Sequence, residues 1–121
     1  MGFAMNQRLD FYKSSPEAIK AMIGLEQRVG KSSLEKGLVE LVRLRASQIN
    51  GCAYCVDMHS HDLRQAGETQ QRLDCLPDWR ETSLYDDRER AALAWAEAVT
   101  QLSTDEVKVN IVHSAVGGIT E

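Results

Sequence analysis

The chain has 121 residues, 43% of them hydrophobic, and its 14 lysines and arginines against 18 aspartates and glutamates give a net charge of −4. This length fits a single domain over residues 1–121, whose modest core gains stability from any partner subunit. The acidic balance argues against nucleic-acid binding, and no apolar run approaches the roughly 20 residues of a membrane span, so we expect a soluble, cytoplasmic protein.

The first third of the chain predicts an arm followed by a helix. Residues 1–14 mix aromatic and polar side chains without a clear period, and we expect an extended or strand-like arm there. Ser15 followed by Pro16 is typical of a helix start, because serine caps backbone donors and proline at the first position loses no hydrogen bond. Gly30 then predicts the end of this helix.

A second, long helix is predicted behind the Ser-x-x-Glu sequence at residues 32–35, which has the form of a capping box. Asn50 and Gly51 tolerate the left-handed conformation that closes a last helical turn, so the helix should end there. Apolar residues extend most of the way around it, which indicates a central position. Arg45 falls within the apolar stripe and therefore requires a carboxylate or an interface partner.

A third helix is predicted to begin at Cys52 and to stop at Gly67. Its three- and four-residue spacing places Cys52, Cys55 and His59 on one face. Two cysteines three positions apart on a helix lie close enough to form a reversible disulfide. The start of a helix also stabilises a thiolate, and an imidazole one turn further on can exchange a proton near neutral pH. The spacing therefore predicts redox chemistry or metal binding.

The remaining elements complete an all-α prediction. Residues 68–75 form a short polar helix that Leu76-Pro77 ends. Asp86, with a glutamate three positions later, is typical of a helix cap, and the apolar periodicity behind it continues to Leu102. A weaker helix is predicted from Ser103 onward. Strand-like alternation never extends beyond a few residues, so the fold class is all-α.

The run from Glu40 to His59 resembles the core of the alkylhydroperoxidase D-like proteins, which belong to the carboxymuconolactone decarboxylase family. It reads ELVRLRASQINGCAYCVDMH, and RQAGET follows at residues 64–69. The likeness extends from about Leu9 to about Val107. It implies the family's compact multi-helix fold, with the Cys-x-x-Cys sequence at the start of a helix.

The resemblance also implies roles for individual residues. The family's glutamate, its two cysteines and its following histidine match, in chain order, Glu40, Cys52, Cys55 and His59. Cys55 would then attack the peroxide, Cys52 would resolve the product as a disulfide, and Glu40 and His59 would relay the proton. Helix-end electrostatics instead favour Cys52 as the attacking thiolate. Tyr54 stands where the best-studied branch has a second histidine, and a phenol can donate a proton but is a weaker acid.

These implied roles describe a thiol-dependent peroxidase, an oxidoreductase that acts on peroxide as acceptor. A hydroperoxide would be the substrate and an external dithiol would reset the disulfide, with no cofactor and no metal. The resemblance further implies a homotrimer, or a hexamer built from trimers. Relatives usually carry a further apolar helix beyond the point where this chain ends, so we expect the family's last helix to be missing here.

Other functions stay open at this point. A decarboxylase-type lyase of the same family would not need the cysteine pair. A non-catalytic, redox-responsive binding protein would use the disulfide only to change a surface. A zinc site of Cys52, Cys55, His59 and His61 is a further alternative, although His61 points about 160° away from His59 on a helix. Cys75 and the remaining histidine belong to no cluster of this kind.

Overall fold

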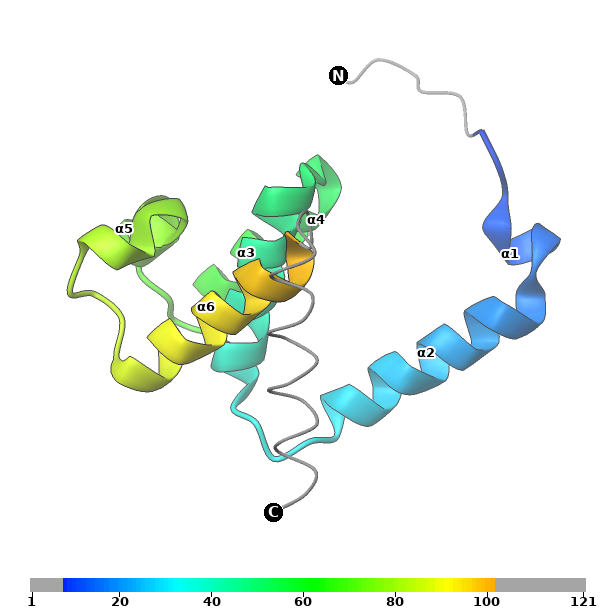
Figure 1. Cartoon of the computed structure of the whole chain (residues 1–121), viewed down its shortest axis with the longest axis horizontal. Coiled ribbons are helices and arrows are strands. Elements are labelled where there is room, and N and C mark those ends of the chain that lie inside the picture. The colour runs from blue at the N-terminus through cyan, green and yellow to red at the C-terminus, as the bar shows by residue number, and fades with distance from the viewer. Residues whose placement is uncertain (1–7, 102–121) are drawn as a thin grey trace. The chain divides into compact units, whose positions relative to one another are not determined.

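The computed structural model describes residues 8–101, and all regular structure within this range is helical, which confirms the all-α prediction (Figure 1). Its elements are α1 (Phe11–Ser14), α2 (Pro16–Gly30), α3 (Lys36–Asn50), α4 (Ala53–Gln65), α5 (Gln70–Cys75), the 3-10 helix η1 (Leu76–Glu81) and α6 (Asp87–Thr100). The chain divides into two units, one up to Ser33 and one from Leu34 onward. The weaker helix predicted from Ser103 lies outside the described residues, and the single domain stays a prediction.

The first unit contains α1 and α2. Residues 11–14 form a helical turn rather than an extended arm, because the carboxylate of Asp10 accepts a hydrogen bond from the backbone N–H of Lys13 at 3.3 Å. Pro16 is the first residue of α2 and Gly30 is its last, as the sequence predicts. The serine before Pro16 makes no capping hydrogen bond with its side chain, so proline alone marks this helix start.

Helix α3 begins later than predicted, because the expected capping box at residues 32–35 does not form. The first helical residue is Lys36, and Glu35 before it has extended backbone angles and makes no capping bond with its side chain. The Glu35 carboxylate instead pairs with Arg88 of α6 at 3.1 Å. Leu34, which precedes the helix, is 48% exposed.

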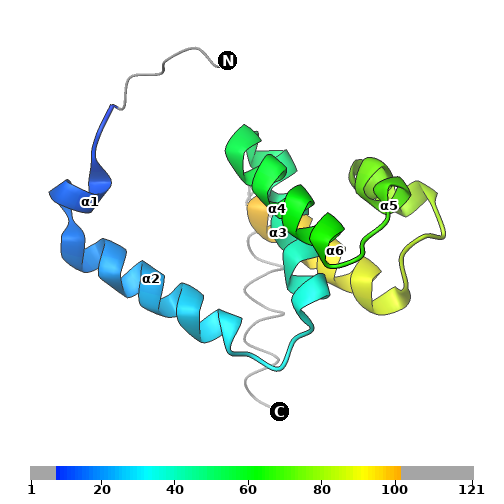
Figure 2. The same ribbon diagram turned by 180° about the vertical axis from the view of Figure 1, so that it is seen from behind.

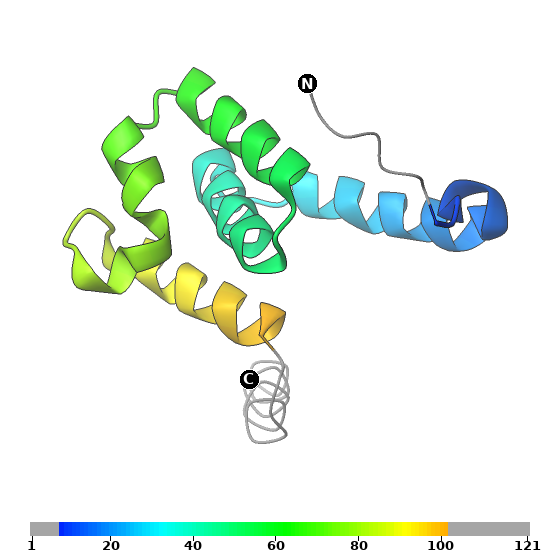
Figure 3. The same ribbon diagram turned by 90° about the horizontal axis from the view of Figure 1, so that it is seen from above.

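Helix α3 lies between α4 and α6 and contacts both, so its predicted central position is confirmed (Figure 3). Its Leu41 and Leu44 side chains are fully buried. The core around them is completed by Leu63, Leu73, Leu76, Trp79, Tyr85 and Leu93. Since each of these side chains removes apolar surface from water, the second unit has a core of its own.

The turn between α3 and α4 positions the cysteine pair. Gly51 ends α3 with a φ of 69° and a ψ of 28°, the left-handed conformation that glycine adopts without strain. Its N–H bonds to the carbonyl of Gln48, and the N–H of Cys52 bonds to the carbonyl of Ser47. The chain thereby reverses within two residues, and α4 packs back along α3 (Figure 2).

The segment from α5 to α6 closes the core. Trp79 is 4% exposed within η1. Asp86 and Glu89 form the predicted capping box at the start of α6, each side chain bonding the backbone N–H of the other. None of the described helices combines the length and the apolar character needed to cross a membrane.

Candidate redox site

Cys52 and Cys55 form a disulfide at the start of α4, with their Cα atoms 5.3 Å apart. Cys52 is the N-cap residue, and its Sγ accepts a hydrogen bond from the backbone N–H of Cys55 at 3.3 Å. Both residues are half-buried. The sulfurs therefore lie at the positive end of the helix dipole, which stabilises a thiolate once the bond is reduced.

A carboxylate on α3 contacts an imidazole on α4, one helical turn beyond Cys55. The Oε2 atom of Glu40 lies 2.7 Å from Nδ1 of His59. Their side chains are only 22% and 14% exposed. An ionised carboxylate only accepts hydrogen bonds, so Nδ1 carries the hydrogen and Nε2 keeps the lone pair. His59 follows Cys55 by one helical turn, so the two residues lie on the same side of α4.

Arg43 fixes the orientation of the same carboxylate. Its Nη1 donates to Oε1 of Glu40 at 2.9 Å, while Oε2 faces His59. The two oxygens thus have separate partners, one on α3 and one on α4. This arrangement limits rotation of the carboxylate and holds the imidazole in one orientation, as partners of functional histidines commonly do.

The other predicted residues lie apart from the Glu40–His59 pair. Tyr54 is 78% exposed, and Met58 one turn further on is 39% exposed. The phenol therefore faces solvent beside the disulfide, and its role in proton transfer stays a prediction. His61 is exposed, and Cys75 is a half-buried cysteine outside any disulfide.

The structure does not assemble the zinc set of two cysteines and two histidines. Sulfurs bonded to each other are not available as thiolate ligands. A different set of metal-ligand side chains meets among the described residues, because one ligand atom from each of Glu40, His59 and Asp62 lies within 4.8 Å of the others.

Glu97 of α6 is the carboxylate that Arg45 requires. It accepts hydrogen bonds from Nε of Arg45 at 3.0 Å and from Nε1 of Trp79 at 2.9 Å, and it pairs with Arg80. Burial by itself would raise the pKa of Glu97, but the hydrogen bonds from Arg80, Trp79 and Arg45 outweigh burial and lower the pKa. The position of Arg45 in an apolar stripe indicates that it requires a carboxylate partner. The sequence does not indicate which carboxylate, because Glu97 lies 52 positions further along the chain.

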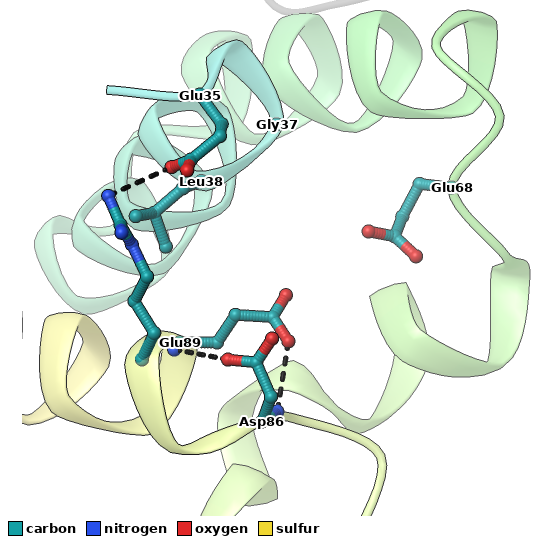
Figure 4. A pocket seen from close by; sticks show the side chains of 7 residues that line it. Glu35, Gly37, Leu38, Glu68, Asp86 and Glu89 are labelled. Atoms are coloured by element: carbon teal, nitrogen blue, oxygen red, sulfur yellow. Dashed lines mark hydrogen bonds and ion pairs between the residues drawn. The ribbon is translucent and has the colours of Figure 1, made fainter. Parts of the chain in front are cut away.

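A hollow of about 310 Å³ lies between the starts of α3 and α6, and Glu68 from the turn between α4 and α5 also lines it (Figure 4). It is lined by Glu35, Gly37, Leu38, Glu68, Asp86, Arg88 and Glu89. Salt bridges or the capping box engage each of its four carboxylates. None of the predicted site residues lines it, so the hollow adds nothing to the redox site.

Two comparisons with known proteins match most of the chain. The family model of the Carboxymuconolactone decarboxylase family matches residues 16–98. The uncharacterized protein YdfG of Bacillus subtilis is 40% identical over 109 residues, which cover 90% of this chain and 74% of YdfG. The chain therefore belongs to the carboxymuconolactone decarboxylase family, and the resemblance to its alkylhydroperoxidase D-like members is confirmed.

Other relatives are matched over shorter stretches. The uncharacterized protein YnjA of Escherichia coli is 34% identical over 70 residues, which cover 58% of this chain and 38% of YnjA. The alkyl hydroperoxide reductase AhpD of Nocardia farcinica is 40% identical over 45 residues, or 37% of this chain and 25% of that protein. The chain thus spans well under half the length of these two relatives.

Proposed function

We propose that this protein is a thiol-dependent peroxidase that reduces hydroperoxides with the Cys52/Cys55 pair. The observation that carries the proposal is the 2.7 Å contact between Glu40 and His59, one helical turn beyond Cys55. Relatives from Nocardia farcinica and Bradyrhizobium diazoefficiens that bear the name alkyl hydroperoxide reductase AhpD support the same chemistry. A carboxylate, an imidazole and a reversible disulfide are the groups that this chemistry requires.

In the first step, His59 Nε2 takes the thiol proton of Cys55, and the thiolate attacks one oxygen of the hydroperoxide. A sulfur–oxygen bond forms, the O–O bond breaks, and the departing alkoxide receives the proton from His59. The products are an alcohol and a Cys55 sulfenic acid. Glu40 stabilises the imidazolium that exists between the two proton transfers.

In the second step, Cys52 attacks the sulfenic sulfur of Cys55. The disulfide forms, and the hydroxyl group leaves as water with the proton of the Cys52 thiol. An external dithiol then supplies two electrons, becomes a disulfide itself and restores both cysteines. The N–H of Cys55 that points at the Cys52 sulfur supports Cys52 as the thiolate released in this exchange.

Turnover with a dithiol tests the proposal. Wild-type protein with tert-butyl hydroperoxide and dithiothreitol should consume many equivalents of peroxide, whereas Cys52→Ser and Cys55→Ser should not. Cys75→Ser is the matched control and should keep wild-type turnover, because Cys75 lies outside the disulfide. A single stoichiometric oxidation without turnover would favour the redox-responsive binding protein, and a wild type that never forms the bridge would contradict both readings.

Trapping the sulfenic acid tests which cysteine attacks. One equivalent of peroxide is added to each reduced single variant, and dimedone adducts are located by mass spectrometry. Cys52→Ser should form the adduct on Cys55. A stoichiometric adduct on Cys52 in the Cys55→Ser protein would reverse the proposed order.

A further inference from the structure

We infer that Glu40, His59 and Asp62 form a binding site for a divalent transition-metal ion such as Zn²⁺, and that an ion bound there blocks proton exchange at His59. The binding site follows from the geometry of these three side chains. Only the inhibitory effect rests on the proposed peroxidase function.

The three side chains converge from two packed helices. Asp62 follows His59 by three residues on α4, so both occupy the same side of that helix, and Glu40 reaches them from α3. One ligand atom of each lies within 4.8 Å of the others. Tetrahedral ligands on bonds of about 2.1 Å are about 3.4 Å apart, so Glu40 and His59 must separate slightly from 2.7 Å and Asp62 must approach by up to roughly 1.5 Å. Asp62 is exposed and can make that movement by changing rotamer.

The donors suit zinc better than magnesium or calcium. One imidazole and two carboxylates supply three protein ligands and leave a fourth position open to water. Arg43 already occupies Oε1 of Glu40, so Oε2 on the His59 side is the oxygen positioned for the ion. The two carboxylates outweigh the single positive charge of Arg43 and leave the site with a net negative charge.

An ion at this site changes the chemistry of His59. The ring nitrogen that faces Glu40 is Nδ1, and an ion bound there replaces its hydrogen. In a neutral imidazole the hydrogen then resides on Nε2, which can no longer accept the proton of Cys55. Metal binding and proton relay therefore exclude each other.

Calorimetric titration of ZnSO₄ into tag-free, disulfide-oxidised protein tests the site, because the bridged sulfurs cannot bind the metal. Wild type should bind one ion per chain. Asp62→Asn should weaken binding at least about tenfold, and His59→Gln should abolish it. Asp57→Asn, on the exposed part of the same helix and outside the set, should bind as wild type does. Equal affinity of Asp62→Asn and wild type, or no binding by wild type, would overturn the site.

A single-turnover measurement tests the inhibitory effect separately. Reduced protein freed of dithiol is mixed with one equivalent of peroxide in the presence and absence of Zn²⁺. Both proteins contain the same cysteines, so stronger inhibition of wild type than of Asp62→Asn reports the site itself. Equal inhibition of the two would refute the block at His59. A wild type that fails to react without metal would instead refute the proposed peroxidase, while the calorimetric result stands.

Discussion

The carboxylate of Glu40 contacts two different partners with its two oxygens. Arg43 on its own helix holds one oxygen and His59 on α4 faces the other. The sequence shows the spacing between Glu40 and Cys52, but it does not show that the two oxygens of Glu40 contact different partners. The proposed proton relay therefore depends on both the charge and the orientation of Glu40.

Replacing Glu40 by glutamine should lower peroxide turnover by roughly 10²- to 10⁴-fold. An amide keeps the shape of the side chain but no longer stabilises the imidazolium of His59. Steady-state peroxide consumption measures the loss, and circular dichroism verifies the fold. Glu17→Gln on the exposed surface of α2 is the control and should keep wild-type turnover. Wild-type turnover in Glu40→Gln would contradict the relay.

A second prediction at the residue scale concerns the ionisation of Tyr85 at high pH. Burial raises the pKa of Tyr85 to about 12, and its hydroxyl donates to the backbone carbonyl of Arg72. The neutral phenol is therefore favoured by folding, and its stabilising contribution is lost as pH rises from about 10 towards 12. Absorbance at 295 nm should show one of the three tyrosines ionising at about pH 12. Tyr85→Phe should remove that late step, and its persistence would refute the assignment.

At the scale of elements, glycine and proline predict helix ends well, whereas polar capping sequences do so less reliably. Gly51 permits the left-handed backbone that ends a helix and Pro16 fixes φ at a value that suits a helix start, and both act where the sequence indicates. The Ser-x-x-Glu sequence at residues 32–35 fails because its effect depends on a glutamate whose side chain pairs with Arg88 instead. The capping box at Asp86 forms, since its glutamate remains within reach of the helix start.

Two glycines of the same helix should respond in opposite directions to alanine. Gly51→Ala should lower the free energy of unfolding by about 1–2 kcal/mol, because its φ of +69° strains an L-residue. Gly37→Ala should raise it by about 0.5 kcal/mol, since a Cβ there meets nothing within 4 Å and helical alanine costs less entropy. Urea unfolding measures both. Unchanged or increased stability of Gly51→Ala would show that the turn at Gly51 has no special requirement, and a loss of stability in Gly37→Ala would contradict the prediction for that position.

At the scale of the whole second unit, Glu97 joins three elements. It binds Arg45 of α3, Trp79 and Arg80 of η1, and itself belongs to α6. Its side chain is 12% exposed, so water replaces these bonds poorly when one partner is removed. The cluster fixes α6 against α3, the helix that also packs against α4 (Figure 3).

Glu97→Gln should lower the free energy of unfolding at pH 7 by about 3 kcal/mol. The folded state lowers the pKa of Glu97 below its ordinary value of 4.5, so this stabilisation is complete above that value and is lost as pH falls through the folded pKa. The stability gap between wild type and variant should therefore shrink from pH 7 to pH 3. Urea titrations at both pH values measure it, with exposed Glu81→Gln as control. A gap that does not change with pH would contradict the charged network.

The sequence by itself determined the all-α class, most helix boundaries and the cysteine pair, because these depend on backbone restrictions and on spacings within one helix. The family spacing of Glu40, Cys52, Cys55 and His59 is likewise local. The homo-oligomer that the resemblance implies stays a prediction.

Only the tertiary structure decided which side chains of different helices meet. The contact of Glu40 with His59, the approach of Asp62 to both, and the pairing of Arg45 with Glu97 require α3 to pack against α4 on one side and α6 on the other. Periodicity gives the face of each helix but not its angle or register against a neighbour. Those depend on how the buried leucines and Trp79 fill the space between helices, which no local pattern specifies.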